Sequence, residues 1–119
     1  MTDPKAQKYL YDVLTAIRQI EEFLGAERNF SVYQQDAMLR SAVERQLIIV
    51  GEAVNRLRQL DENIPLTASQ AIVQFRNRIT HEYDRIDDVN VWAILVKHLP
   101  KLKEETKHLL NRSIDKGEK

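Results

Sequence analysis

Residues 38–57, MLRSAVERQLIIVGEAVNRL, are the stretch that decides the fold. Apolar residues recur in it every three or four positions, as they do along one face of an amphipathic helix: Met38, Leu39, Ala42, Val43, Leu47, Val50, Val54 and Leu57. Within this stretch the four consecutive apolar residues LIIV at 47–50 place apolar side chains on all sides of the helix. We therefore predict a long central helix that is covered on more than one side, by its own bundle or by a second subunit.

Gly51 lies inside this predicted helix, where glycine costs about 1 kcal/mol relative to alanine. Two structural roles for Gly51 would compensate for that cost. Gly51 allows a close crossing of two helices, or it makes room beside a site to which Glu52 and Asn55 point. The sequence alone does not choose between them.

Helix boundaries follow from capping residues on both sides of the central helix. Asp3 followed by Pro4 predicts a first helix from residue 4 to Leu24, with Gly25 ending it. Ser31 and, three residues later, Gln34 have the form of a capping box, and no proline follows before Leu60. The second helix is accordingly expected to run unbroken from the Ser31 cap to about residue 60.

Two further helices are expected downstream. Thr67 with Gln70 repeats the capping-box form and opens a short third helix, and the acidic residues 87–88 favour the start of a last one. Pro100 should kink the last helix or divide it in two. We predict an all-α, up-and-down bundle of four to five helices, a single domain over residues 1–119 with a frayed tail from about 113.

Composition limits the function classes. Lys plus Arg and Asp plus Glu number 18 each, so the chain lacks the excess of basic residues typical of proteins that bind nucleic acid mainly through its phosphates. The absence of cysteine excludes disulfides and thiolate metal sites, and the scattered carboxylates and the other histidines form no clear metal motif. No segment has the length and hydrophobicity of a signal peptide or a membrane span, so we expect a cytoplasmic protein.

The chemistry-bearing residues gather in one stretch, RNRITHEY at 76–83. Arginine pairs with phosphate through its planar fork, and histidine exchanges a proton near neutral pH. Because successive helical residues are rotated by about 100°, Arg76 and His81 diverge in an unbroken helix. For both to reach one phosphate, the helix should end or bend near Thr80.

Each of these residues also has an ordinary structural interpretation. Arg76 suits a surface ion pair, His81 a helix end, Asn77 a solvated cap and Tyr83 a core anchor. The stretch alone does not choose between these roles and catalysis.

The motif Arg76-Asn77-x3-His81 resembles the signature of the HEPN superfamily, and its longer form ending in Tyr83 resembles the version in HepT-like toxins. Several other segments resemble the same family in the same order: residues 45–53 (RQLIIVGEA), Ile64-Pro65, Val91-Trp92 and Leu99-Pro100. Val50, where many relatives carry isoleucine, and Leu66, where they often carry an aromatic residue, depart from the pattern.

The resemblance implies a HEPN-like homodimer that acts as a metal-independent ribonuclease without a cofactor, with two motif copies facing a shared cleft. It also implies a type VII-like toxin–antitoxin system. Its partner would be a cognate MntA-type minimal nucleotidyltransferase antitoxin, which neutralises the toxin by transferring AMP to the motif tyrosine. Tyr83 is the matching position.

Chemistry then suggests a role for each residue. We expect Arg76 and His81 to be catalytic in transesterification by the RNA 2′-hydroxyl, and Asn77, Arg78 and Glu52 to support them or bind RNA. For Arg78 and Glu52, ordinary surface ion pairing is at least as good an interpretation. The alternative function is a non-catalytic helical partner of a nucleotidyltransferase, which binds a nucleotide phosphate through the motif.

Overall fold

The computed structural model describes residues 3–26, 28–81 and 87–117, and from residue 113 onward it describes the backbone alone. Every regular element in this part of the chain is helical, as predicted. The helices are α1 (Pro4–Leu24), α2 (Phe30–Gln35), α3 (Ala37–Leu60), α4 (Ser69–His81), α5 (Asp88–Ala93), the π-helix η2 (Ile94–His98) and α6 (Leu99–Gly117).

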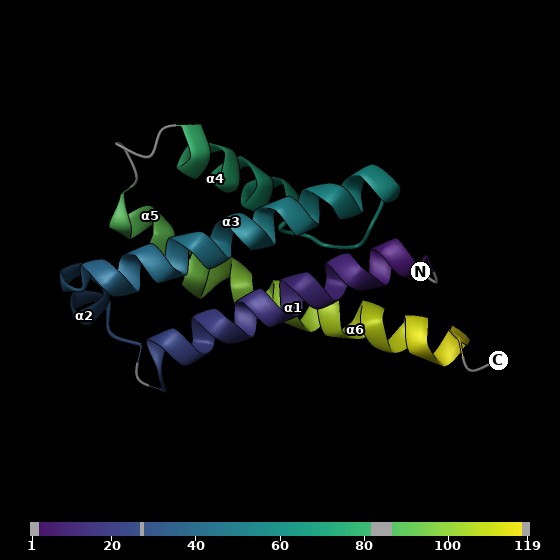
Figure 1. Cartoon of the computed structure of the whole chain (residues 1–119), viewed down its shortest axis with the longest axis horizontal. Helices are drawn as coiled ribbons and strands as arrows, with labels where there is room; N and C mark the ends of the chain where they lie inside the picture. The colour runs from purple at the N-terminus through teal and green to yellow at the C-terminus, as the bar shows by residue number, and fades with distance from the viewer. Residues whose placement is uncertain (1–2, 27, 82–86, 118–119) are drawn as a thin grey trace.

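Helix α3 is the central element, as the apolar run at 47–50 predicts. It packs against α1 on one side and α4 on the other, and α6 packs against the far side of α1 (Figure 1). The long helices alternate in direction along the chain (Figure 1). Val43, Leu47, Val50, Val54 and Leu57 of α3 are buried. Met38, which the same pattern assigned to the core, is 84% exposed in the first turn of the helix.

The first helix has the predicted boundaries. The Asp3 side chain accepts a hydrogen bond from the Lys5 amide at 2.8 Å, and Pro4 occupies the first turn. Gly25 ends the helix with a φ of 74°, a conformation that favours glycine, and its amide donates to the Glu21 carbonyl.

The predicted single helix from Ser31 to residue 60 is wrong at its beginning. Asn29, rather than Ser31, caps α2, and a second cap at Asp36 separates α2 from α3. Asp36 has an extended backbone, and its carboxylate accepts a hydrogen bond from the Leu39 amide at 3.0 Å. A short side chain that bonds to the local backbone competes with the helix, which explains the interruption.

Pro100 divides the last helical region, as predicted. Proline lacks an amide donor and its ring crowds the preceding turn, so the α-helical bond to the residue 96 carbonyl cannot form. The chain responds with the wider π-helical turn of η2, in which the Leu99 amide donates to the Ile94 carbonyl. Upstream, Asp87 caps α5 by accepting from the Val89 amide at 2.9 Å.

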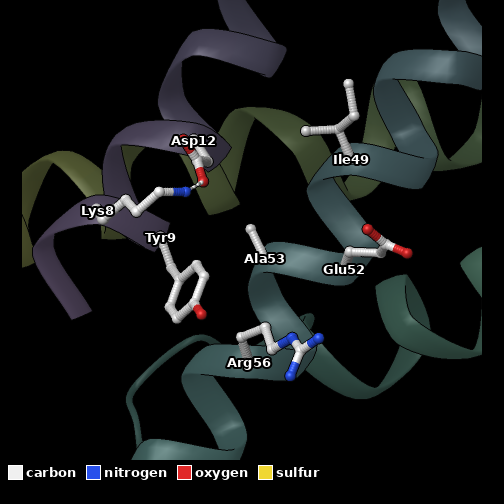
Figure 2. A pocket seen from close by; sticks show the side chains of 7 residues that line it. All are labelled: Lys8, Tyr9, Asp12, Ile49, Glu52, Ala53 and Arg56. Carbon is white, nitrogen blue, oxygen red and sulfur yellow. Dashed lines mark hydrogen bonds and ion pairs between the residues drawn. The ribbon is translucent and has the colours of Figure 1, made fainter. Parts of the chain in front are cut away.

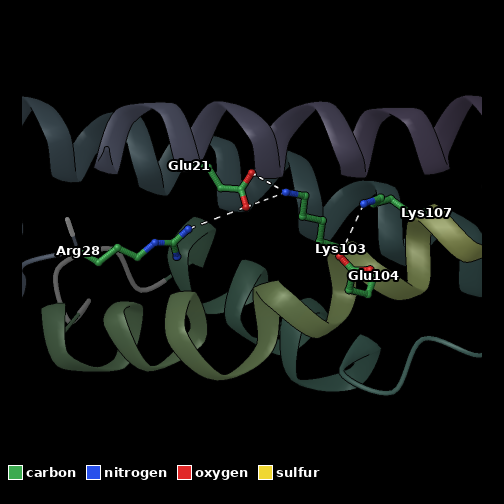
Figure 3. Close-up of polar contacts among 5 residues, drawn as sticks. All are labelled: Glu21, Arg28, Lys103, Glu104 and Lys107. Carbon is green, nitrogen blue, oxygen red and sulfur yellow. Dashed lines mark hydrogen bonds and ion pairs between the residues drawn. The ribbon is translucent and has the colours of Figure 1, made fainter. Parts of the chain in front are cut away.

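Aromatic and charged contacts fix the outer helices. Trp92 of α5 lies between Phe30 and Tyr33 of α2, with ring centroids 5.6 and 5.5 Å away. On the other side, Lys103 of α6 donates to both carboxylate oxygens of Glu21 on α1 at 2.9 and 3.0 Å (Figure 3). These contacts hold the last helical region against the first half of the chain.

Glu44 of α3 provides a test of this packing. Burial raises the pKa of its carboxyl, and the nearby Asp88 carboxylate raises it further, although Arg40 opposes the change. The pKa is higher in the folded chain than in the unfolded one. The carboxyl therefore lowers the free energy of unfolding as the pH rises through the interval between these two pKa values. Glu44→Gln should therefore raise the melting temperature at pH 7 and have little effect at pH 4.

Thermal denaturation followed by circular dichroism measures this difference. Glu62→Gln, at an exposed position of the α3–α4 connection, is the matched control and should leave the melting temperature unchanged at both pH values. An equal or lower melting temperature for Glu44→Gln at pH 7 would contradict the unfavourable burial of this carboxylate.

Candidate functional site

The candidate site is built where α4 crosses α3, and Gly51 determines how close the crossing is. A Cβ atom added at Gly51 would lie 2.7 Å from the Arg76 Cγ, closer still to the Arg76 Cβ, and 3.4 Å from the Ile72 carbonyl oxygen. Real Cβ atoms essentially never approach so closely, so a residue with a side chain cannot occupy this position unless α4 moves. The interpretation of Gly51 as a close helix crossing is confirmed, and the residue pressed against it is Arg76.

Arg76 is fixed in place by this contact. The Arg76 side chain is half-buried, and its Nε atom is buried without a hydrogen-bond partner among the residues that the structure describes. A guanidinium nitrogen that has lost water and found no protein acceptor carries an energetic cost, which a local rearrangement that gave it an acceptor would relieve. No ion pair of Arg76 is found within the described residues, and its catalytic role stays a prediction.

Helix α4 carries the rest of the motif as far as the structure describes it. Asn77 and Arg78 are exposed, whereas the neighbouring Phe75 and Ile79 anchor the helix in the core. No acidic residue occurs in Ser69–His81, so the two arginines give α4 a local positive charge within a chain of zero net charge. Such a local charge is compatible with contact to a phosphate group in a chain that has no overall excess of basic residues.

The structure describes the predicted helix end near Thr80 only as far as His81. Thr80 is helical, and its hydroxyl donates to the carbonyl oxygens of Arg76 and Asn77, both at 3.1 Å. Such a bond to the preceding turn often bends a helix. Helix α4 includes His81, whose side chain is not described, and Tyr83 lies outside the described residues. Whether α4 ends there stays a prediction.

The expected start of α4 was wrong by about one residue. The Ile72 amide donates to the Ala68 carbonyl, so Ala68 occupies the N-cap position that we assigned to Thr67. The Thr67 amide and hydroxyl bond instead to the Glu105 carboxylate of α6, at 3.1 and 3.4 Å from its Oε1. This contact joins the segment that precedes α4 to α6.

Glu52 lies beside the crossing but does not pair with the motif. No ion pair joins it to Arg76 or Arg78 within the described part of the chain, and its side chain is exposed. Glu52 lines a pocket of about 180 Å³ between α1 and α3 together with Lys8, Tyr9 and Arg56 (Figure 2). In that pocket Lys8 is paired with Asp12 at 3.0 Å. The supporting role of Glu52 in catalysis stays a prediction.

A second pocket, of about 230 Å³, lies beside α4 on the side of α5 and η2. Its polar lining residues are Gln74 and Arg78 of α4 and Asn90 of α5. The sequence pattern indicates Arg78 but neither amide residue, because an isolated glutamine or asparagine carries no motif. Only the packing of α4 beside α5 brings the two together.

Two structural features bear on ligands and location. Within residues 3–26, 28–81 and 87–117, no three His, Asp or Glu side chains gather as a metal site would require. In the same ranges, no helix has both the length and the apolar character needed to cross a membrane. The expectations of metal-independent action and of a cytoplasmic location stay predictions.

Comparison with known proteins decides the family. The profile described as HepT-like, Ribonuclease HepT-like, matches residues 13–109, which include α3, the crossing and the motif. The chain belongs to the HepT-like family of the HEPN superfamily. The resemblance seen in Arg76, His81 and the segments around them is confirmed at the level of the family.

Named relatives agree with this assignment. The chain is 30% identical over 106 residues to "Putative RNase MJ1380" of Methanocaldococcus jannaschii, covering 88% of this chain and 96% of that protein. It is 32% identical over 99 residues to "Probable ribonuclease HepT" of Thermococcus cleftensis, covering 80% and 86%. A third relative, "Putative RNase TTE0752" of Caldanaerobacter subterraneus, is 28% identical over 85 residues, covering 71% and 76%. No solved structure gives a significant match.

Proposed function

We propose that this HepT-like protein is a metal-independent endoribonuclease and the toxin of a type VII-like toxin–antitoxin pair. The observation that carries the proposal is Arg76, which packs against Gly51 on a helix without a carboxylate and whose buried Nε has no hydrogen-bond partner among the described residues. A guanidinium in that state favours a bound phosphate, and membership of a ribonuclease family makes RNA the substrate.

RNA carries its own nucleophile, because the 2′-hydroxyl lies beside the scissile phosphate. In the proposed reaction His81 removes the proton of this hydroxyl, the oxygen attacks phosphorus, and the bond to the 5′-oxygen breaks. The leaving 5′-oxygen takes up a proton from solvent or from a protonated side chain in the cleft. Arg76 stabilises the negative charge on the phosphoryl oxygens, and Asn77 orients His81 or contacts the phosphate.

Helix geometry supports a homodimer as the active form. In α4, five residues separate Arg76 from His81, which corresponds to a rotation of about 140° and a rise of about 7.5 Å. The two positions therefore face different directions on one copy of the helix. Two copies of α4 across a shared cleft would bring Arg76 of one subunit towards the motif of the other, and would also double the local positive charge.

The products test the mechanism. Cleavage by the purified chain in excess EDTA should leave a 2′,3′-cyclic phosphate and a 5′-hydroxyl, identified by mass spectrometry of an oligonucleotide substrate. A substrate with a single 2′-deoxynucleotide at the mapped cleavage position should resist cleavage there and remain sensitive elsewhere. A 3′-hydroxyl product that forms only when metal is added would contradict the proposed mechanism.

Tyr83 is the proposed point of control. An AMP group on its phenol would add a bulky negative charge two residues from His81, and would exclude an RNA phosphate by volume and by charge repulsion. Co-expression with an active MntA-type nucleotidyltransferase should increase the mass of the chain by whole AMP groups, and the Tyr83→Phe variant should keep its original mass. An unmodified Tyr83 in an inhibited complex would favour inhibition by occlusion instead.

The second candidate is a non-catalytic partner of a nucleotidyltransferase that binds a nucleotide phosphate through the motif. The unpartnered Nε of Arg76 fits this role as well. It predicts no RNA cleavage by the purified chain and weaker nucleotide binding in Arg76→Ala. RNA cleavage that depends on Arg76 excludes it.

A further inference from the structure

The pocket between α4 and the α5–η2 region has an apolar floor that no step of the proposed reaction uses. Phe75 and Ile94 line it and are only 8% and 9% exposed, and Ala71 and Ala93 complete the floor with small side chains. The pocket has a volume of about 230 Å³. The pocket is a hollow in the surface, open to solvent on one side, with a volume sufficient for one aromatic ring system.

The rim of the pocket is polar. Gln74, Arg78 and Asn90 are exposed, and their side chains have no hydrogen-bond or ion-pair partner among the residues that the structure describes. The two carboxamides each offer a donor and an acceptor, and Arg78 adds a positive charge. An aromatic floor below two free carboxamides is the combination that proteins use to hold an unpaired base.

The register of α4 places this rim on the side of the helix to which position 81 belongs, about 160° round the helix axis from Arg76. Gln74 and position 81 are seven residues apart, which in a helix leaves them within about 20° of each other, and Arg78 lies between them. The pocket is therefore on the side of α4 to which position 81 belongs. A base seated in it would bring its phosphate towards position 81, and Arg76 would then come from the second copy of α4 in the proposed homodimer.

We propose that this pocket holds one unpaired adenine of the RNA substrate and thereby selects the cleavage position. This inference rests on the proposed ribonuclease function. Gln74 and Asn90 read the edge of the base, since carboxamides pair with the N6 and N7 atoms of adenine in a bidentate fashion. Phe75 contacts the ring from the floor, and Arg78 binds the adjoining phosphate.

Uridine-rich RNAs that differ at one nucleotide test the proposal. Four such RNAs carry A, G, C or U at the same internal position. The wild-type chain should cleave beside the adenosine, with kcat/KM about tenfold above that for the other three. Gln74→Ala and Asn90→Ala should each lower kcat/KM for the adenosine RNA about tenfold, whereas Gln59→Ala, an exposed amide on α3, should not.

A second pair of variants tests the pocket without removing a polar group. Ala71→Leu fills the floor and should abolish the preference for adenosine, whereas Ala37→Leu, at an exposed position of α3, should preserve it. Circular dichroism verifies that both fold.

The outcomes separate the two proposals. Equal kcat/KM for all four RNAs, or unchanged values in all three pocket variants, would overturn the adenine pocket and leave the ribonuclease intact. If the wild-type chain cleaves none of the RNAs, the ribonuclease proposal fails. In that case the binding of the same RNAs, fluorescently labelled, is measured by fluorescence anisotropy. Tighter binding of the adenosine RNA that is lost in Ala71→Leu supports the adenine pocket. Equal binding of all four RNAs overturns the adenine pocket.

Discussion

Arg76→Ala is expected to lower the rate of RNA cleavage by about a hundred- to a thousandfold, the cost typical of losing one donor to a developing oxyanion. The expectation comes from the position of the side chain. Arg76 cannot move towards α3, because Gly51 lies against it, and its buried Nε has no competing acceptor in the described part of the chain. Steady-state kinetics on one defined RNA measures the change.

Arg76→Lys separates the chemistry from the packing. Lysine retains an aliphatic stem against Gly51 and a positive charge, so the variant should unfold at nearly the wild-type urea concentration. It loses the planar fork and the Nε donor, so most of the rate should still be lost. Arg112→Ala, at an exposed position of α6, is the matched control with wild-type kinetics. Wild-type rates in Arg76→Ala would remove Arg76 from the site.

Gly51→Ala should have an effect on activity nearly as large, although Gly51 bears no chemical group. The new Cβ would lie 2.7 Å from the Arg76 Cγ, so α4 or the arginine stem must shift. A misplacement of about 1 Å is enough to cost about a hundredfold in rate. We therefore expect kcat to fall by about that factor.

The effect on stability should be much smaller, because two terms oppose each other. Alanine is favoured over glycine in a helix by about 1 kcal/mol, while overpacking typically costs about 1–3 kcal/mol. Urea denaturation should accordingly show a loss of no more than about 2 kcal/mol. Gln59→Ala on the same helix is the control. Normal activity in a folded Gly51→Ala variant would show that the crossing does not position Arg76.

The sequence was sufficient for the features that depend on local chemistry. Asp3, Pro4 and Gly25 defined α1 because caps and special backbone angles act within one turn. Pro100 predicted the division of the last helix for the same reason. The glycine in the middle of α3 left two interpretations open, a close helix crossing or room beside a site, and only the packing of α4 shows the crossing.

Features that depend on distant partners could not be predicted in this way. Thr67 looked like a cap, but Glu105 on α6, 38 residues away, takes its donors. Ser31 and Gln34 matched a capping box, yet Asn29 and Asp36 took the capping positions. Several sequence-compatible caps compete within a few residues, and tertiary packing selects among them.

The same distinction applies to the site. Arg76 was found by its motif, but its burial against Gly51 and its free Nε emerge only from the packing of α4 on α3. Gln74 and Asn90 carried no signal, because their proximity depends on the fold alone. The functional roles of all the predicted site residues stay predictions: Arg76, His81, Asn77, Arg78, Glu52 and Tyr83.

The central claim is that Arg76 and His81 form a ribonuclease site that works without metal. It is tested most directly by cleavage of one RNA, in excess EDTA, by the wild-type chain, Arg76→Ala and His81→Ala, purified in parallel. We expect cleavage by the wild type and rates lower by about a hundredfold or more in both variants. Equal residual activity in all three proteins, or cleavage by none of them until metal is added, would contradict it.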